Sequence, residues 1–325
     1  MNAVVSSTQK MLEEEPLNAA KRLVSIVTPS FNQARFLEET IRSVALQDYR
    51  PIQHIIIDGG STDGSVEILK RCSKEFEHGD YSLEWVSEPD HGMPDALGKG
   101  FDRARGEILG WLNSDDVYFD RYAVTSAAAE FERHPQVDVV YGDVALISET
   151  SGLMMVWCFP NFDYKRALRG YIIPQPTVFL RRKIVSEHPI GSLRFVGIDH
   201  AYWLEIGRTN KFRHIHRLQA ADRDHASRLS LTKHSQWTEE GRRYLASYGN
   251  GYFPTGRDHA FDVVTRALMR LKASAYLANV LTRKQKVAFP MWTDGLLKIF
   301  IRQLTMRIGN RPHLGPRKIE WRIEM

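Results

Sequence analysis

Residues 110–116 of the chain read Gly-Trp-Leu-Asn-Ser-Asp-Asp, and the rest of the sequence is interpreted outward from them. The residues that lead into this stretch, 108–112, are apolar and predict a short buried strand. The strand ends just before the adjacent carboxylates Asp115 and Asp116. Ligands of open α/β sheets bind outside the carboxyl ends of the strands, where carboxylates can hold a divalent cation. Ser114 and Asp115 are also suited to capping the next helix, so two interpretations stay open.

Upstream of this stretch, short apolar strands alternate with helical patterns. Strands are predicted at residues 23–27, 54–57 and 83–86, and amphipathic helices follow the first two. Ser30 or Asn32 is expected to cap the first helix. This alternation with short loops predicts an α/β fold with a mostly parallel, Rossmann-like sheet flanked by helices.

Polar segments follow each of these strands. Residues 28–32 read Thr-Pro-Ser-Phe-Asn, and residues 58–65 read Asp-Gly-Gly-Ser-Thr-Asp-Gly-Ser, with glycines that permit a tight turn close to a ligand. After the third strand, Pro94 suits the first turn of a helix that carries Asp95 and Lys99 one turn apart. The pair is either a surface ion pair or a lysine that reaches an anionic ligand at the same sheet edge.

Length and composition describe an ordinary globular chain. It has 325 residues, of which 43% are hydrophobic and 26% charged, and its two cysteines lack metal-ligand spacing. This cysteine usage fits a reducing compartment, and no apolar run approaches the length that spans a bilayer. Residues 1–21 lack the apolar region of a signal peptide and are expected to form a flexible tail.

The net charge of +5 is unevenly distributed along the chain. Residues 266–325 hold 13 Lys+Arg and 3 Asp+Glu, whereas residues 1–265 hold 31 and 36. Helices are predicted at residues 263–281 and at the apolar, basic stretch 296–304. This segment is either a helical cap on the main domain or a contact with an anionic membrane surface, where each Lys or Arg contributes about 1 kcal/mol.

Four ordered motifs carry a resemblance to a known family; they lie at residues 28–32, 58–65, 95–100 and 112–116. In this order and at these intervals they resemble the inverting glycosyltransferases of family 2, over about residues 22–230. The resemblance implies the GT-A fold. It divides the chain into a nucleotide-sugar-binding half at 22–120, an acceptor-binding half at 121–235 and a basic, mainly helical C-terminal extension at 236–325.

The resemblance also implies roles for individual residues. Its nucleotide-sugar site would consist of Thr28, Pro29, Ser30, Asn32, Asp58, Asp95, Lys99, Ser114 and Asp115. Asp58 would accept a hydrogen bond from uracil, because an ionised carboxylate only accepts and the uracil imide donates. Asp115 and Asp116 fall on the region that holds Mg²⁺ or Mn²⁺ and the diphosphate. The chain departs from the family pattern at Asn113, in place of a first Asp, and at Gly98, where Asn is frequent.

Three further positions match the family pattern downstream. Gln175 corresponds to a segment near the acceptor site, with bonding of loop backbone as its alternative role. Asp199, at the start of a helix predicted at 197–206, corresponds to the catalytic base, with helix capping as the alternative. His225 would be a third metal or phosphate contact, or a structural histidine.

The function that this resemblance implies is transfer of a sugar, with inversion, from a nucleotide-diphosphate donor to an acceptor hydroxyl. A UDP-sugar donor and a saccharide or lipid-linked saccharide acceptor are expected, in polysaccharide or lipid-linked saccharide synthesis. A cytoplasmic location is expected, with peripheral membrane contact through the basic segment and no nucleic-acid partner. Two other classes stay open. One is a metal-dependent nucleotidyltransferase, which usually has a glycine-rich phosphate loop after the first strand; the other is a non-catalytic protein that binds nucleic acid or a membrane surface.

Overall fold

The computed structural model describes residues 22–76, 79–170, 173–193, 197–249, 252 and 254–282. The predicted tail at 1–21 and the predicted helix at 296–304 lie outside the described residues, as do residues 171–172 and most of the basic segment.

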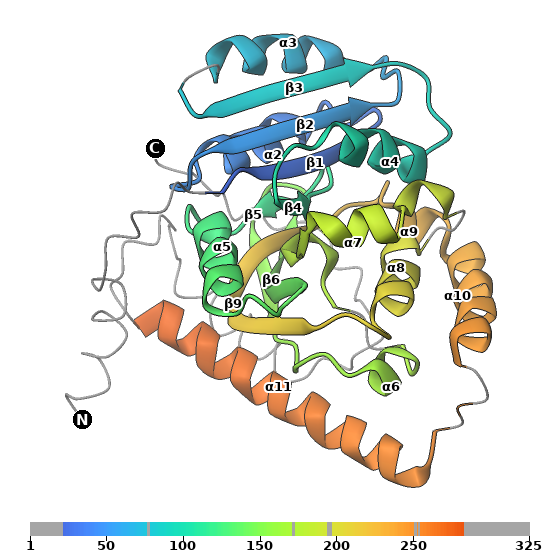
Figure 1. Cartoon of the computed structure of the whole chain (residues 1–325). Coiled ribbons are helices and arrows are strands. Elements are labelled where there is room, and N and C mark those ends of the chain that lie inside the picture. The colour runs from blue at the N-terminus through green and yellow to red at the C-terminus, as the bar shows by residue number, and fades with distance from the viewer. Residues whose placement is uncertain are drawn as a thin grey trace.

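Four parallel strands form the first half of the sheet, as the sequence predicts (Figure 1). They are β1 (Val24–Ser30), β2 (Ile52–Asp58), β3 (Tyr81–Ser87) and β4 (Ile108–Trp111). Their order is β3-β2-β1-β4, so β1 lies at the centre with β2 and β4 on either side. The carboxyl ends of β1, β2 and β4 therefore meet at one edge of the sheet.

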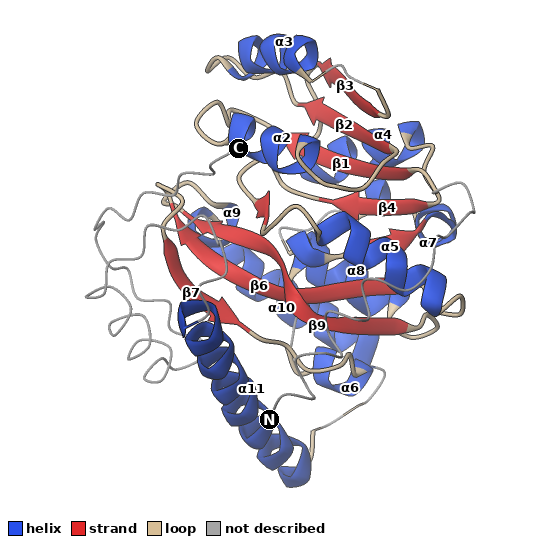
Figure 2. Ribbon diagram, turned by 90° about the vertical axis from the view of Figure 1, so that its left-hand side faces the viewer, coloured by secondary structure: helices blue, strands red, loops and turns tan. Residues whose placement is uncertain are grey.

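The second half of the sheet is mixed, which corrects the expectation of a mostly parallel sheet. Its strands are β5 (Val117–Tyr118), β6 (Val139–Ser148), β7 (Leu153–Trp157), β8 (Phe179–Arg181) and β9 (Phe212–Asp224). β8 pairs antiparallel with β4 and β6, whereas β6 and β9 pair in parallel. β6 and β7 form an antiparallel hairpin, because a short turn of four residues, 149–152, joins the two strands. The α/β, GT-A type architecture is confirmed, with a curled mixed sheet (Figure 2).

Helices cover both faces of the sheet (Figure 1). The described helices are α2 (Leu37–Ala45), α3 (Ser65–Glu75), α4 (Met93–Arg103), α5 (Ala123–Arg133), α6 (Tyr164–Ala167), α7 (Arg182–Glu187), α8 (Ile198–Ile206), α9 (Leu229–Thr232), α10 (His234–Gly249) and α11 (Gly256–Thr282), with 3₁₀ turns η1 (Gln175–Thr177) and η2 (Ile190–Ser192). None of the helices among the described residues is both long and apolar enough to cross a membrane.

Strand β2 shows why its residues are nearly all apolar. Side chains alternate between the two faces of a strand. Ile56 therefore packs in the cluster of α2 and α3, whereas Ile55 and Ile57 pack in the cluster of α4. A strand covered on both faces loses the alternation of apolar and polar residues, so its sequence is a continuous apolar run.

The capping prediction for the first helix was wrong. β1 continues to Ser30, which pairs with Asp58 of β2, and Phe36 is the residue before α2. No side chain caps α2, and the amide oxygen of Asn32 accepts instead from the backbone N–H of Thr62, at 3.0 Å. Because the strand and a loop occupy residues 24–36, neither predicted cap reaches the helix.

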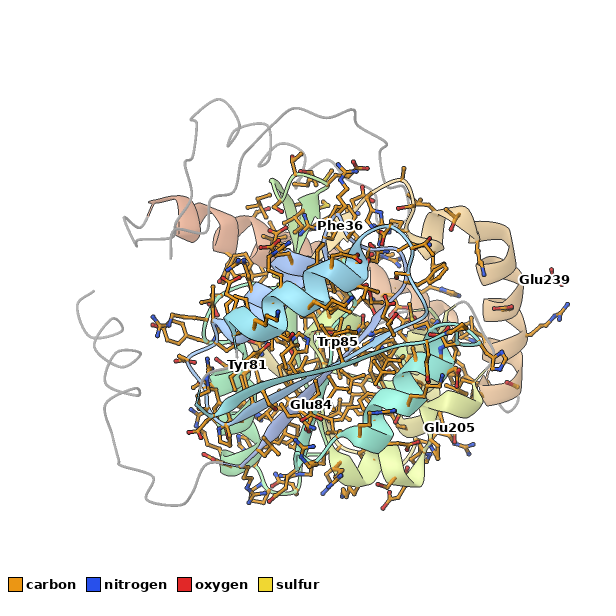
Figure 3. The ribbon with its side chains drawn as sticks, turned by 90° about the horizontal axis from the view of Figure 1, so that it is seen from above. Phe36, Tyr81, Glu84, Trp85, Glu205 and Glu239 are labelled. Atoms are coloured by element: carbon orange, nitrogen blue, oxygen red, sulfur yellow. The ribbon has the colours of Figure 1, made fainter. Side chains whose placement is uncertain are left out.

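The outer edge of the first half is β3, whose labelled residues are seen from above in Figure 3. On this strand, Glu84 forms an ion pair with Arg105 at 2.5 Å and accepts from Gln53 at 3.1 Å. A charged side chain on an edge strand disfavours pairing with a strand of another chain, so we expect the sheet to end at β3.

Candidate active site

The turn after β4 presents the two predicted metal acids. Its backbone closes where the N–H of Asp116 donates to the carbonyl of Asn113 at 3.1 Å. The hydroxyl of Thr40 on α2 contacts the carbonyl oxygens of Ser114 and Asp116, at 2.9 and 2.8 Å. Ser114 and Asp115 do not cap α5, because that helix begins at Ala123 with Tyr122 before it. The turn therefore serves to hold the acids against α2.

Asp115 and His225 meet at this turn. The Oδ2 atom of Asp115 lies 2.8 Å from Nε2 of His225, and the other ring nitrogen lies 2.9 Å from the hydroxyl of Ser227. The His225 side chain is buried, whereas 21% of the Asp115 side chain stays exposed. A carboxylate and an imidazole are thus in direct contact with one open side.

Arg223 fastens this pair to the rest of the fold, and sequence reasoning did not find it. Its backbone N–H donates to Asp116 Oδ1 at 3.0 Å, and its Nε donates to the carbonyl of Asp115 at 2.8 Å. The two terminal nitrogens donate to Ser151 and to Glu39, each at 2.6 Å. The Arg223 side chain is fully buried. No signal in the sequence connects Glu39 with Arg223, because they lie 184 positions apart.

Two further acids join Asp115 at this edge of the sheet. Burial, together with the charges of Asp115 and Asp222, raises the pKa of Asp116 well above its ordinary value. Asp222 is balanced by Arg228, at 3.2 Å, which also contacts Asp224 at 2.8 Å. The site therefore concentrates negative charge in a buried place, which is the environment in which a cation or a shared proton is stabilised.

Asp199 lies in the first turn of α8, and the negative charge of this acidic cluster affects its pKa. Burial raises the pKa of Asp199, and the charge of Asp222 adds to the rise, while the N–H of His200 opposes it. Gly197 precedes α8, and no side chain caps the helix. The capping alternative for Asp199 is therefore not what the structure shows.

Asp58, the predicted uracil acceptor, is fully buried at the end of β2. Its carboxylate accepts from the N–H and the hydroxyl of Ser61, at 2.9 and 2.5 Å, and from the hydroxyl of Ser87, at 2.7 Å. These contacts are turn chemistry, and they occupy three of about four acceptor positions of a carboxylate. The contact with uracil stays a prediction.

The loop after β1 is tied to the loop after β2. Asn32, at φ 53°, donates its N–H to the hydroxyl of Ser61 at 2.7 Å. Thr28 faces the core and contacts His54 at 3.0 Å, and its neighbour Pro29 pairs with Ile57 of β2. The buried hydroxyl of Ser30 has no hydrogen-bond partner among the described residues. Ser30, the last residue of β1, thus brings an unsatisfied hydroxyl group to the predicted donor site.

Lys99 and Asp95 pair on α4, as their spacing predicts. The Lys99 ammonium lies 3.4 Å from Asp95 and 3.0 Å from Glu88. The hydrogen bond to Glu88 raises the pKa of Lys99, and the N–H of His91 and the Lys99 charge lower the pKa of Asp95. Lys99 is therefore positively charged. To bind an anionic ligand, its ammonium group must give up its contact with Asp95 or with Glu88.

Gln175 braces the turn after β4. Its amide nitrogen donates to the carbonyl of Trp111 at 2.6 Å, and its oxygen accepts from the amide of Asn113 at 2.9 Å. Asn113 in turn accepts from the indole of Trp111 at 2.8 Å. These contacts agree with the alternative role of Gln175, which is hydrogen bonding within the loop. Its place near the sugar-acceptor site stays a prediction.

The donor set suits a divalent cation in part. The described residues contain no cluster of three His, Cys, Asp or Glu side chains arranged as metal ligands. Asp115 and His225 do supply one oxygen and one nitrogen at contact distance, with an exposed side. Mg²⁺ and Mn²⁺ commonly take one or two protein ligands and complete their shell with water and substrate phosphates. Asp115 and His225 fit such a site, whereas one oxygen of Asp116 is engaged by the Arg223 backbone.

Comparisons with known proteins place the chain. Residues 25–188 match the profile of glycosyl transferase family 2. An uncharacterized glycosyltransferase of Mycobacterium tuberculosis (strain H37Rv) is 38% identical over 166 residues, covering 50% of this chain and 60% of the relative. A PGL/p-HBAD biosynthesis glycosyltransferase of the same strain is 31% identical over 176 residues, covering 54% and 66%. The matched part thus spans about three fifths of the length of these relatives.

Two solved structures share the fold. Staphylococcus aureus TarS residues 1–349, in complex with UDP-GlcNAc, superposes with a TM-score of 0.55 at 15% identity, covering 86% of this chain and 81% of that one. The mannosyltransferase PcManGT from Pyrobaculum calidifontis, in complex with GDP-Man and Mn²⁺, gives 0.52 at 15% identity, covering 87% and 83%. The profile match over half of the chain and the shared fold lead to one conclusion: the chain belongs to glycosyltransferase family 2, a family of transferase enzymes.

Proposed function

We propose that the chain transfers a sugar, with inversion, from a UDP-sugar to the hydroxyl of a saccharide or lipid-linked saccharide. Family membership favours sugar transfer over the nucleotidyltransferase and over the non-catalytic alternative. The observation that carries the proposal is the contact between Asp115 and His225, with Asp199 beside the same acidic cluster. In this proposal, Asp115 and His225 bind the cation and Asp199 acts as the base.

Asp199 is the residue that takes the acceptor proton in this mechanism. As the hydroxyl oxygen attacks the anomeric carbon, its proton passes to the Asp199 carboxylate, and the bond from that carbon to the diphosphate oxygen breaks. A raised pKa suits this task, because it makes the ionised carboxylate a stronger base. Attack opposite the leaving group inverts the anomeric configuration, and no covalent enzyme intermediate forms.

Asp115 and His225 would hold Mg²⁺ or Mn²⁺, which when bound offsets the charge that grows on the leaving diphosphate. Arg223 keeps both ligands in place through its contacts with Asp115, Asp116 and Glu39. Such fixed positioning limits reorganisation during the reaction, which is where electrostatic stabilisation gains most of its effect.

The donor base and the cellular setting are parts of the same proposal. The two loops that Asn32 and Ser61 join, with Asp58 beneath them, would bind the nucleotide. Support for a nucleotide-sugar comes from the fold neighbours, whose titles name UDP-GlcNAc and GDP-Man. We place the enzyme in the cytoplasm, in polysaccharide or lipid-linked saccharide synthesis, with the basic segment contacting the inner membrane face and no nucleic acid bound.

Nucleotide binding and product stereochemistry test this proposal. Calorimetry with UDP, GDP and CDP, each with and without Mn²⁺, should give the tightest binding for UDP with the metal. Proton NMR of the product should show an anomeric configuration opposite to that of the donor. Tighter binding of GDP would overturn the uracil assignment, and a retained configuration would overturn the single displacement.

A further inference from the structure

Helix α11 carries an apolar face that the described residues leave largely exposed, although the Arg166 guanidinium lies over the Phe261 ring, 5.0 Å from its centroid. Phe261, Val264, Leu268 and Leu271 are between 54% and 61% exposed, on a helix whose other side is packed on the sheet. The packed side includes Asp262, which pairs with Arg169 at 2.5 Å, and Lys272, which pairs with Asp143 at 2.9 Å. Among the described residues, this helix holds most of the large apolar side chains that are exposed. The face needs an explanation that packing within the described fold does not give.

The spacing of the face is that of a helix-to-helix seam. Residues 261, 264, 268 and 271 are separated by three, four and three positions, which are the a and d positions of a heptad. Ala275 continues the seam, and the exposed Ala260 and Ala267 lie directly beside it. Large side chains in heptad order insert between those of a facing helix, and neighbouring alanines let the two backbones approach closely. We refer to residues 261, 264, 268, 271 and 275 as the seam.

The charge pattern identifies the partner of the seam. No Asp, Glu, Lys or Arg stands on the seam from Phe261 to Ala275. An anionic lipid surface attracts helices whose apolar face is flanked by Lys and Arg, and Arg266 and Arg270 lie off the seam, towards Val263. The basic segment 283–325 would call for acidic partners, and the seam offers none. The same face of a second copy meets neither obstacle, because its seam carries no charged residue between Phe261 and Ala275.

The size of the face agrees with that partner. An exposed apolar patch of this kind is on the order of 500 Å², the upper range for an ordinary monomer. Two copies face to face would remove about 1,000 Å² from water, the size at which specific protein interfaces begin. We propose that the chain forms a twofold-symmetric dimer in which α11 packs antiparallel on the α11 of a second copy, seam against seam.

The symmetry fixes the register of the proposed dimer. In a twofold interface, residue i contacts j and j contacts i. With the axis midway between Phe261 and Leu271, Val264 faces Leu268 of the other copy, and Phe261 faces Leu271. The packed side of α11 reaches the cluster of Val117 and Ala221 beside the turn after β4, whereas the seam lies on the other side of this helix, which runs below α2 and β1 in both views (Figures 1 and 2). Assembly therefore leaves the candidate active site open.

Sedimentation velocity of the full chain tests the proposal. The wild type should sediment as a dimer at micromolar concentration. The double variant Leu268→Glu/Leu271→Glu should weaken dimerisation at least ~100-fold, because four unpaired carboxylates would enter an apolar interface. Val263→Glu is the matched control: its position is 58% exposed on the same helix but lies off the seam, so this variant should remain dimeric. UDP binding should be equal in all three proteins, which separates this test from that of the proposed function.

Disulfide crosslinking tests the register. A mixture of Val264→Cys chains and Leu268→Cys chains should crosslink more readily than either variant alone, because these two positions face each other in the proposed register. The two native cysteines are buried and should not contribute to the crosslinking. A monomeric wild type would overturn the proposal, and so would a dimer that survives both glutamates. Preferential crosslinking of Leu268→Cys to itself would overturn this register of the dimer.

Discussion

The carboxylate of Asp115 lies 2.8 Å from the imidazole of His225, although 110 positions separate the two residues in the sequence. Antiparallel pairing of β5 with β9 produces this contact, because Val117 faces Ala221 across the sheet. The turn before β5 and the end of β9 are thus brought to the same place. The contact joins a hard oxygen ligand to a nitrogen ligand, the combination on which the proposed metal site depends.

Removing either member of this pair should abolish most of the activity. Asp115→Ala and His225→Ala are each expected to lower turnover at least ~100-fold, the order for loss of a charge-stabilising contact at a reacting group. Calorimetric titration with Mn²⁺ in the presence of UDP should show weaker metal binding in both variants. Glu239→Gln, on the exposed face of α10, is a matched control and should behave as the wild type. Undiminished turnover in EDTA would contradict the metal assignment.

Asp199→Asn should remove the base and leave the fold intact. We expect turnover to fall by ~10²–10⁴-fold while UDP-sugar affinity and melting temperature stay unchanged, since Asn keeps the size of the side chain. The raised pKa of Asp199 adds a pH signature: the acid limb of kcat/KM should lie above the ordinary aspartate value of about 3.9. Glu239→Gln, on the exposed face of α10, is the control. A variant Asp199→Asn that keeps a third of its turnover would move the search for the base to Asp222, Asp224 or Glu205.

Asp58→Ala should weaken UDP binding by about 1.5–3 kcal/mol, the usual contribution of a hydrogen bond to a charged group. The same change releases Ser61 and Ser87, so the melting temperature should also fall. Ser87→Ala separates the two effects, because it removes one support of the carboxylate and leaves the carboxylate itself. If UDP binds no more tightly than CMP or GMP to the wild type, Asp58 has only its role in the turn.

Arg223→Ala should destabilise the fold and loosen the metal site together. Loss of the buried guanidinium leaves the carboxylate of Glu39, which still accepts from Ser151, without its positive partner, and this costs about 3 kcal/mol for a broken buried pair. Urea unfolding measures the loss of stability, and Mn²⁺ affinity measures the effect on Asp115. Glu39→Gln keeps a hydrogen-bond acceptor and should cost less. Equal stability of Arg223→Ala and the wild type would show that the network is not a support of the site.

His54 should make the protein less stable in acid. It is fully buried between Thr28 and Tyr81, and burial lowers the pKa of His54 from 6.5 to about 3. The unfolded chain binds a proton at this position below pH 6.5, while the folded chain does not until about pH 3. The contribution of His54 is therefore complete above pH 6.5 and is lost as the pH falls towards 3, at up to ~1.4 kcal/mol per pH unit.

Urea unfolding of the wild type and of His54→Gln, from pH 7 to pH 4, checks this expectation. Other groups titrate equally in both proteins, so the difference between the two slopes isolates His54. The free energy of unfolding of the wild type should fall more steeply as the pH decreases, by a difference in slope that corresponds to the uptake of about one proton. Parallel slopes would mean that His54 binds a proton within the folded protein.

The sequence by itself determined the first half of the fold and the family. Continuous apolar runs predict β1, β2 and β4 because a strand covered on both faces needs no polar residue, and these runs end where polar motifs begin. The motifs are local, so their spacing along the chain is enough to recognise them. The helices at 197–206 and 263–281 were also predicted, and α8 and α11 lie there.

Only the tertiary structure decided which residues meet at the site. The contacts of Asp115 with His225 and of Arg223 with Glu39 join segments more than 100 positions apart, and antiparallel strands that the sequence did not predict bring them together. The structure likewise showed which side of α11 is packed and that its heptad seam is exposed. The sequence could not decide this, because a helix with two apolar faces has the same sequence pattern whichever face the sheet covers.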